Sequence, residues 1–381
     1  MKHIPLVGLF VQYQQIKPEV DLAIKKVINT SAFVGGDEVR AFEEEFARYC
    51  QVDHCVGVAN GTDAIELTLR ALGIGSGHEV ITSPLTFFAT AEAILNVGAQ
   101  PVFVDVAADT GLMRVDRLRS AITSRTKAIV AVHLYGQPCD MGDLASVARG
   151  YRLRLIGDAA QAHGALWRGR PIATYADATT FSFYPGKNLG ALGDAGAVVT
   201  ANQALAADVR RLANHGREEK YIHSAVGRNS RLDTLQAAVL SLKLARLAEW
   251  NARRVALAEQ YRERLRALPV CLPSTAPGAC HVWHFFTIRT RERDRLKQAL
   301  AGRGIETGIH YPVPLHLQPA MAGRFAGAHE FPIAEQLAAT TLSLPLYPEL
   351  SDDAQREIVD TIAECLLSGD WTDSAPLECR T

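Results

Sequence analysis

Short apolar runs alternate with amphipathic stretches between residues 54 and 200, and this alternation restricts the fold more than any other feature of the chain. The apolar runs predict strands at residues 54–60, 79–83, 100–106, 126–136 and 152–160. The stretches between them predict helices at residues 62–73, 86–96 and 141–149. Strands rich in Val, Ile and Leu that alternate with helices are typical of a mainly parallel sheet covered by helices on both faces. The sequence therefore predicts an α/β fold whose ligand lies beyond the carboxyl ends of the strands.

The length and the C-terminal pattern predict a second, smaller domain. A chain of 381 residues exceeds one ordinary core. One or two long helices are predicted at residues 231–268, followed by a strand at 281–290 and helices at 293–303 and 352–367. We expect a large domain over residues 1–240, with the N-terminal segment included, and a small α+β domain over residues 241–381. The residues from about 369 onward are expected to form a loose tail.

Composition excludes several classes of partner. The chain has 40 basic and 41 acidic residues and a net charge of -1, so no electrostatic footprint for nucleic acid or an acidic membrane is present. No apolar stretch is long enough to span a bilayer, and the N-terminal residues lack the pattern of a signal peptide. The seven cysteines are scattered and never spaced as CxxC. We therefore predict a cytoplasmic protein with reduced thiols and no metal site.

A glycine-rich segment at residues 181–200, FSFYPGKNLGALGDAGAVVT, carries one lysine, Lys187, between two apolar runs. Gly186 precedes this lysine, and three more glycines follow it within ten residues. Glycine lets the backbone approach a ligand closely. Lys187 therefore lies either on a surface turn or at the mouth of a pocket where its amine takes part in chemistry.

Asp158 ends the apolar run LRLIG, which places its carboxylate at the ligand edge of the predicted sheet. The same residue type is also a common helix N-cap. Gln161 and His163 follow in DAAQAHGA, and such a polar cluster after a buried strand favours a functional role.

The helix predicted after the first strand begins near Asp63, directly after Gly61 and Thr62. Free amides at a helix N-terminus together with a hydroxyl form a phosphate-binding site, although Thr62 could serve as a simple cap. Ser182, at the end of another predicted strand, could direct a second hydroxyl to the same place. Phe87 follows a strand as well and is either a core residue or a ring that stacks on a flat ligand.

Together these residues meet the needs of pyridoxal phosphate. Its aldehyde requires a lysine amine that can deprotonate. Its pyridine nitrogen requires a carboxylate that keeps the ring protonated, so that the ring acts as an electron sink. Its phosphate requires amides and hydroxyls, and its ring requires a face to stack on. We predict that Lys187 holds this cofactor and that the glycines around it make room for a planar ligand.

The sequence resembles the DegT/DnrJ/EryC1/StrS group of sugar aminotransferases, within the aspartate-aminotransferase fold type. The resemblance spans nearly the whole chain and rests on six segments in the family's order. They are FVGGDEVRAFEEEFARYC, GVANGTDAIELTLRALGIGSGHEVITSPLTFFATAEAI, GDAAQAHGA, FSFYPGKNLGALGDAGAVVT, GRNSRLDTLQAAVL and YPVPLHLQPA. It implies a large cofactor-binding domain with a mainly parallel mixed sheet and a smaller C-terminal α+β domain.

The resemblance implies a role for several residues. Lys187 matches the lysine that binds the cofactor covalently, Asp158 the acid paired with the pyridine nitrogen, and Gln161 the residue that contacts the ring hydroxyl. The phosphate ligands are matched by Thr62, Ser182 and the backbone at Asp63, and the stacking ring by Phe87. Asn229, in GRNSRLD, matches an asparagine that reaches the phosphate from the neighbouring subunit. The family therefore implies a homodimer whose two active sites are shared.

The implied reaction moves an amino group from an amino acid, L-glutamate by resemblance, to a keto sugar of a nucleoside diphosphate. The segment YIHSAVGRNSRLDTLQAA resembles the branch that aminates C3 of the sugar, so we predict a 3-keto hexose substrate. The alternatives are a 4-keto sugar aminotransferase of the same family and a catalytically idle regulatory homologue that binds the cofactor. His310, Tyr311 and His316 are expected to line the sugar end of the pocket, although buried structural roles also fit both histidines.

Overall fold

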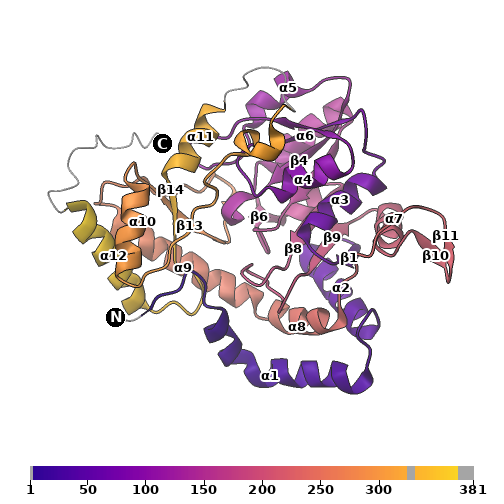
Figure 1. Ribbon diagram of the computed structural model, residues 1–381, viewed down its shortest axis with the longest axis horizontal. Helices are drawn as coiled ribbons and strands as arrows, with labels where there is room; N and C mark the ends of the chain where they lie inside the picture. The colour runs from indigo at the N-terminus through magenta and orange to yellow at the C-terminus, as the bar shows by residue number, and fades with distance from the viewer. Residues whose placement is uncertain (1–2, 324–330, 368–381) are drawn as a thin grey trace.

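The structure, a computed structural model, describes residues 3–323 and 331–367 of the chain. It places a large sheet with its helices beside a smaller group of helices and strands from the C-terminal part of the chain (Figure 1). The tail predicted from about residue 369 lies outside the described residues.

The large sheet has seven strands and is mainly parallel, as predicted. Its strands are β1 (His54–Val58), β2 (Glu79–Thr82), β3 (Gln100–Phe103), β4 (Thr126–Val132), β5 (Arg154–Asp158), β8 (Ala178–Ser182) and β9 (Gly196–Thr200). Their order is β1-β9-β8-β5-β4-β2-β3, and β9 runs antiparallel to both of its neighbours. The remaining pairs are parallel, so β2, β4, β5 and β8 end at the same edge of the sheet.

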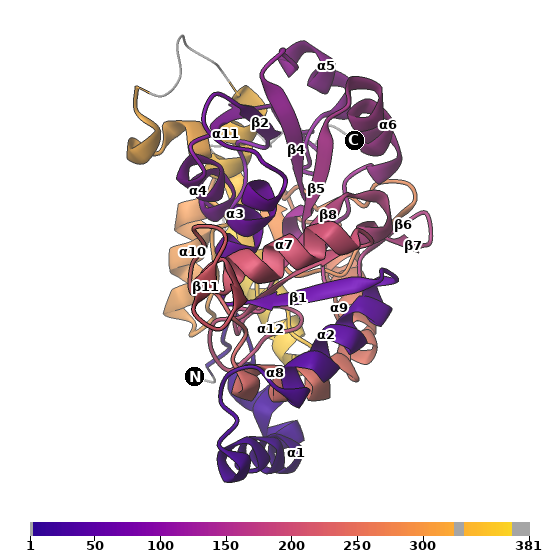
Figure 2. The same cartoon turned by 90° about the vertical axis from the view of Figure 1, so that its right-hand side faces the viewer.

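Helices cover both faces of this sheet (Figure 2). One face packs against α3 (Gly61–Ala71), α4 (Ala89–Asn96) and α7 (Gln203–Ala213). The other packs against α2 (Asp37–Cys50), α6 (Met141–Tyr151) and α8 (Thr234–Leu244). The helix predicted from residue 86 begins at Ala89, because the chain bends at residues 84–86.

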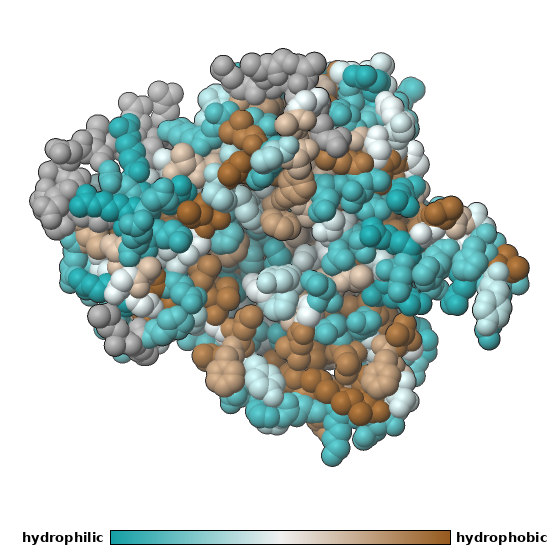
Figure 3. All heavy atoms as spheres, in the orientation of Figure 1, coloured by the Kyte–Doolittle hydropathy of each residue, from teal (hydrophilic) through white to brown (hydrophobic). Residues whose placement is uncertain are grey.

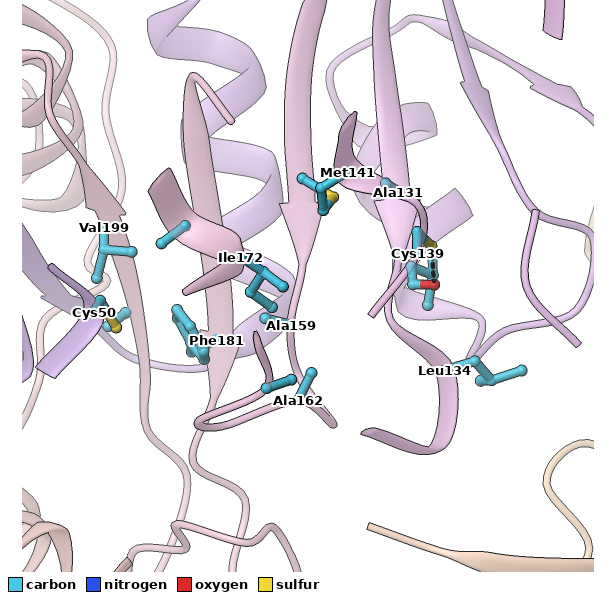
Figure 4. Close-up of a cluster of buried hydrophobic side chains, with 14 of the residues drawn as sticks. Cys50, Ala131, Leu134, Cys139, Met141, Ala159, Ala162, Ile172, Phe181 and Val199 are labelled. Atoms are coloured by element: carbon cyan, nitrogen blue, oxygen red, sulfur yellow. Dashed lines mark hydrogen bonds between the residues drawn. The ribbon is translucent and has the colours of Figure 1, made fainter. Parts of the chain in front are cut away.

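The main core lies on the face covered by α2, α6 and α8. Strand residues alternate between the faces, so Ile129 joins this core whereas its neighbour Val130 points to α3 and α4. Figure 4 shows Phe181, Ile172 and Met141 in this core, together with the Cys139 thiol, which donates to the carbonyl of Val132. The strands between the edge strands β1 and β3 therefore bury apolar residues on both faces.

The C-terminal part builds a second core around α9 (Leu247–Leu265). The helical pattern predicted at residues 231–268 is therefore two helices, α8 and α9. The second core also contains residues of α10 (Arg293–Gly302), α12 (Asp352–Leu367) and the antiparallel pair β13 (Phe286–Arg289) and β14 (Thr341–Leu344). Ile4 packs into it through a parallel bridge to Ile305, although we expected the N-terminal segment in the large domain. The boundary near residue 240 stays a prediction.

The strand predicted at residues 281–290 is shorter than expected and covers 286–289. Its first part hydrogen-bonds across to the large domain instead, since the amides of Val282 and His284 donate to the carbonyls of Gly136 and Tyr135. These residues therefore connect the two cores.

The remaining elements are short or peripheral. They are α1 (Leu9–Thr30), α5 (Leu118–Ala121), α11 (Pro332–Thr340), the three-stranded β6 (Leu166–Trp167), β7 (Arg170–Pro171) and β12 (Ala279–Cys280), and the hairpin β10 (Arg217–Glu219) and β11 (Ile222–His223). Within residues 3–323 and 331–367, every helix is too short or too polar to cross a membrane.

Most described cysteines agree with the predicted reduced state. Free thiols are present at Cys50, Cys55, Cys139, Cys280 and Cys365. The prediction is wrong at Cys271, which is disulfide-bonded. Burial raises the pKa of the Cys50 thiol and keeps it protonated, so this thiol behaves as a small core residue.

Glu43 of α2 supplies a buried carboxylate that fastens this helix to the sheet. It accepts from the amide of Gly57 at 2.7 Å and from both terminal nitrogens of Arg210. Glu43→Ala leaves a buried amide without an acceptor, so we expect a loss of about 2–4 kcal/mol in the free energy of unfolding. Glu44→Ala, at the exposed neighbouring position, should cost less than about 0.5 kcal/mol in the same urea titration. Equal losses would contradict this account.

Candidate active site

A cavity of about 560 Å³ opens at the edge of the sheet where the parallel strands end. The ends of β4, β5 and β8 contribute Val132, Asp158 and Ser182, and the loop after β8 contributes Lys187. Residues 284–285 and 310–311, from the C-terminal part, close the opposite side. The cavity therefore lies at the place where ligands bind in parallel sheets.

Lys187 borders this cavity, as predicted from its glycine-rich segment. Its amide donates to the carbonyl of Tyr184 at 2.8 Å, which forms a tight turn after β8. Burial lowers the pKa of the Lys187 amine to about 8, while the negative charge of Asp158 acts in the opposite direction. Near neutral pH, most of this amine is protonated, but its unprotonated, nucleophilic fraction is far larger than that of an ordinary lysine with a pKa near 10.5.

Asp158 is the last residue of β5 and is 6% exposed. Its Oδ2 accepts from the Thr90 hydroxyl at 2.9 Å, and its Oδ1 accepts from the amide of Ala160 at 3.2 Å. Burial raises the pKa of this carboxyl, whereas the Thr90 and Ala160 donors and the Lys187 charge lower it. These two donors hold the carboxylate at the cavity wall and favour its ionised form.

Gln161 connects three parts of the wall. Its Oε1 accepts from the amide of Tyr135 at 2.6 Å, and its Nε2 donates to the Tyr311 hydroxyl at 3.0 Å. The Tyr135 hydroxyl in turn donates to the carbonyl of His310. The side chain of Gln161 is therefore fixed between the sheet and the C-terminal part of the chain.

The N-terminus of α3 faces the cavity through Gly61 and Thr62. The cap is Asn60, whose Oδ1 accepts from the amide of Asp63 at 2.8 Å, so the simple-cap alternative for Thr62 is wrong. A Cβ on Gly61 would lie 2.6 Å from Cβ of Ser182, and only glycine therefore fits at this position. Glycine allows α3 and β8 to bring their amides and hydroxyls together.

Aromatic rings form the outer wall. Phe87 is 56% exposed, and its ring centroid lies 5.6 Å from that of Tyr311. This ring borders the cavity, so the alternative of a core residue is wrong. On the opposite side, His310 stacks on Phe285 with ring centroids 3.8 Å apart, and its Nδ1 lies 2.8 Å from the Ser343 hydroxyl.

Three predicted positions do not border the cavity within this chain. His316 is paired with Glu335, with a distance of 3.0 Å from Nε2 to Oε1. The backbone amide of Asp63, which was expected among the phosphate ligands, donates to Oδ1 of Asn60 at 2.8 Å, and its side chain forms an ion pair with Arg228 at 3.1 Å. Asn229 is exposed and makes an antiparallel bridge to Asn214. An exposed asparagine is available to a second chain, whereas His316 is held by its own chain.

Other cavity residues were not found by the sequence reasoning. They are Asn60, Thr90, His133, Tyr184 and His284. His133 directly follows β4, so its position after a buried strand is the signal that could have found it. Thr90 and His284 lie within a helix and an irregular segment, where no comparable pattern marks them.

The residues of this cavity fit pyridoxal phosphate. Lys187 could bind its aldehyde, and Asp158 could pair with its ring nitrogen. The amides of Gly61 and Thr62 and the hydroxyl of Ser182 could hold its phosphate, because the missing Cβ of Gly61 leaves a cradle at the positive end of α3. Within the described parts of the chain, no three His, Cys, Asp or Glu side chains cluster as metal ligands do.

This fold and this cavity define a pyridoxal-phosphate-dependent aminotransferase. Residues 14–363 match the profile of the DegT/DnrJ/EryC1/StrS aminotransferase family, and the chain belongs to this family. The predicted fold class, enzyme class and cofactor are confirmed, and the chain is a sugar aminotransferase that uses pyridoxal phosphate.

Named relatives are similar over almost their full length. The chain is 46% identical to dTDP-3-amino-3,4,6-trideoxy-alpha-D-glucose transaminase of Streptomyces venezuelae over 95% of this chain and 96% of that protein. It is 45% identical to UDP-N-acetyl-3-dehydro-alpha-D-glucosamine 3-aminotransferase of Acidithiobacillus ferrooxidans over 95% and 98%. A crystal structure of S. venezuelae DesV in complex with a ketimine intermediate is 46% identical and has a TM-score of 0.94, with 96% of this chain and 99% of that chain covered.

The electrostatics of the cavity generate a pH prediction. In the cofactor-free protein, acetylation of Lys187 should rise with a midpoint near pH 8, because burial disfavours the charged amine. Asp158→Asn should move this midpoint lower, since the carboxylate favours the charged amine. Peptide mapping across a pH series measures both, with exposed Lys25 as the internal control for reagent activity. A higher midpoint in Asp158→Asn would contradict the assignment.

Proposed function

We propose that this chain transfers an amino group from L-glutamate to C3 of a keto sugar carried by a nucleoside diphosphate. The observation that carries the proposal is the cavity itself, in which Lys187 and Asp158 meet the free N-terminus of α3. Bound pyridoxal phosphate supplies an electron sink and a carbon that carries the amino group between the two substrates.

Each residue has a distinct task in this proposal. The neutral amine of Lys187 takes a proton from Cα of the donor and, in the second half of the reaction, returns a proton to the sugar carbon. Asp158 keeps a proton on the ring nitrogen, and its two hydrogen-bond donors favour the ionised form that this requires, against the effect of burial. Gln161 orients the ring hydroxyl, and Phe87 covers one face of the ring.

The sugar site is formed by His310 and Tyr311 at the far side of the cavity. Burial lowers the pKa of His310 to about 4, so the ring is neutral near pH 7 and recognises sugar hydroxyls without adding charge. The names of the S. venezuelae and A. ferrooxidans relatives both specify nitrogen at C3, which supports amination at that carbon. His316 lies outside this site because Glu335 holds it elsewhere.

The experiment that tests this function supplies matched 3-keto and 4-keto sugar nucleotides with L-glutamate and locates the new amine by NMR. We expect the amine at C3, as in the names of the two relatives, and at one carbon almost exclusively, because a misplacement of about 1 Å relative to the cofactor costs roughly a hundredfold in rate. Borohydride reduction followed by peptide mapping should find the cofactor on Lys187. Amination mainly at C4 would overturn the sugar assignment, and a label on another lysine would overturn the site.

The proposal includes a homodimer with shared active sites. Among the described residues that border the cavity, Lys187 is the single lysine and no arginine is present, although a diphosphate and the glutamate carboxylates need cations. The hairpin that carries Arg217 and Lys220 is exposed and precedes Asn229 in the chain. A neighbouring subunit could therefore complete the site with these groups.

Apolar surface supports the same assembly. Figure 3 shows apolar side chains gathered on the lower part of one face, over α1 and α8. Exposed apolar residues of the N-terminal region and the hairpin region include Leu9, Phe10, Val11, Leu22, Ile28, Phe33, Val34, Tyr221, Ile222 and Val226. Clusters of this kind on a soluble protein mark interaction surfaces.

A mixing experiment tests the shared site. Lys187→Ala and Asn229→Ala subunits should each have low activity, while their mixed dimer has one intact site. Random reassembly should restore about one quarter of the wild-type sites. Lys187→Ala mixed with Asp158→Asn is the control, since both changes lie in one subunit's own site and should restore nothing. Equal activity in both mixtures, or an active monomer in sedimentation, would contradict the shared site.

A further inference from the structure

Asn188 follows Lys187 in the chain and is buried behind it, with 3% exposure. Its Nδ2 donates to Oδ1 of Asn251 at 3.0 Å and to the carbonyl of Val282 at 2.9 Å. Its Oδ1 lies 3.1 Å from Nδ1 of His284. Burial lowers the pKa of His284, so this ring is neutral, and Nδ1–H is the donor. The Asn188 amide therefore connects the lysine loop to two other segments, α9 and residues 282–284.

Asn251 of α9 also binds the neighbouring loop of the site. Its Nδ2 donates to the carbonyl of His163 at 2.8 Å, two residues after Gln161. The helix approaches so closely that a Cβ on Gly164, which has a φ of +89°, would lie 2.9 Å from this Nδ2. One buried side chain thus holds both the loop of Gln161 and the loop of Lys187.

The same helix continues into the second core. Arg254, one turn after Asn251, donates through Nη1 to the carbonyls of Trp283 at 3.3 Å and Leu346 at 2.8 Å. Further along α9, Leu257 and Tyr261 are fully buried among residues of the C-terminal core. The orientation of α9 is therefore set by that core, and the polar side chains of its first turns transmit this orientation to the cavity.

We propose that Asn251 is a positioning residue for Lys187, which acts by holding Asn188 and thereby fixes the direction of the lysine side chain relative to Asp158. This inference rests on the proposed role of Lys187. Gly186 leaves the loop without a side chain on the cavity side. Behind the loop, Leu189 is packed in the main core and Lys243 donates to the carbonyl of Gly190 at 2.7 Å, but Asn188 is the restraint directly next to Lys187. Because Asn251 lies on α9, and α9 is packed in the second core, that core also helps to hold the Lys187 loop.

Loss of the hydrogen bond between Asn188 and Asn251 should have two effects on Lys187. A loosened loop admits water to the Lys187 amine, and a hydrated amine gains protonation, so its pKa should rise from about 8. A displaced amine also reacts more slowly with a correctly bound substrate, since a shift of about 1 Å costs roughly a hundredfold in rate. Loss of stability alone changes neither quantity.

The test compares Asn251→Ala and Asn188→Ala with Gln355→Ala. Gln355 is also a buried amide, and it donates to α9 at the carbonyl of Leu257, within the second core and away from the cavity. In cofactor-free protein, the midpoint of Lys187 acetylation should rise in Asn251→Ala and at least as far in Asn188→Ala, and the double variant should rise no further than Asn188→Ala, because Asn251 acts through Asn188. It should stay near pH 8 in Gln355→Ala. In the holoenzyme, kcat should fall about 10- to 100-fold in the first three proteins with little change in KM for glutamate.

The outcomes separate this inference from the proposed function. Wild-type enzyme that holds no cofactor on Lys187 after borohydride reduction overturns the proposed function. Wild-type enzyme labelled at Lys187, with Asn251→Ala and Gln355→Ala alike in midpoint and kcat, overturns the positioning role alone. Far-UV circular dichroism and urea unfolding check that each variant folds. If Asn251→Ala does not fold, Asn188→Ala still tests the hydrogen bond between Asn188 and Asn251.

Discussion

The parallel register of β4, β5 and β8 is the constraint on which the site depends. Val132 pairs with Asp158, and Asp158 pairs with Thr180, so these strands end close together at the same edge of the sheet. A slip of one residue would turn Asp158 to the opposite face of the sheet. This register is secured by burial on both faces, because alternate residues of each strand enter the separate cores. The cores therefore determine where the carboxylate lies.

Burial shifts the pKa values of Lys187 and Asp158 in opposite directions. It lowers the pKa of the amine and raises that of the carboxyl, so each group alone would tend to lose its charge. Their mutual attraction opposes both shifts, and the Thr90 hydroxyl adds to it on the carboxylate. The Asp158 carboxylate can therefore pair with a positive charge. The pKa of the Lys187 amine lies close enough to neutral pH for the amine to exchange protons.

Much of this arrangement could be predicted from the sequence, because the residues of the site directly follow buried strands or lie among glycines. Lys187, Asp158 and Gln161 were found in this way, and their cavity is confirmed, although their roles remain proposals. His316 was expected to line the cavity but does not border it, and only the fold shows that Glu335 lies close enough to pair with it. The N-cap at Asn60 was missed because Thr62 is also a good cap by residue type. Contacts between distant segments leave no local pattern in a sequence.

The lysine loop combines two opposite demands. On its cavity side it must be bare, because bulky side chains would exclude a planar cofactor, and Gly186 meets this demand beside Lys187. A bare loop is flexible, however, and a flexible amine cannot hold one direction toward its substrate. Asn188 resolves the conflict, since its amide points away from the cavity and binds Asn251 and Val282 in the interior. The restraint lies behind the loop, where it takes up none of the space that the cofactor needs.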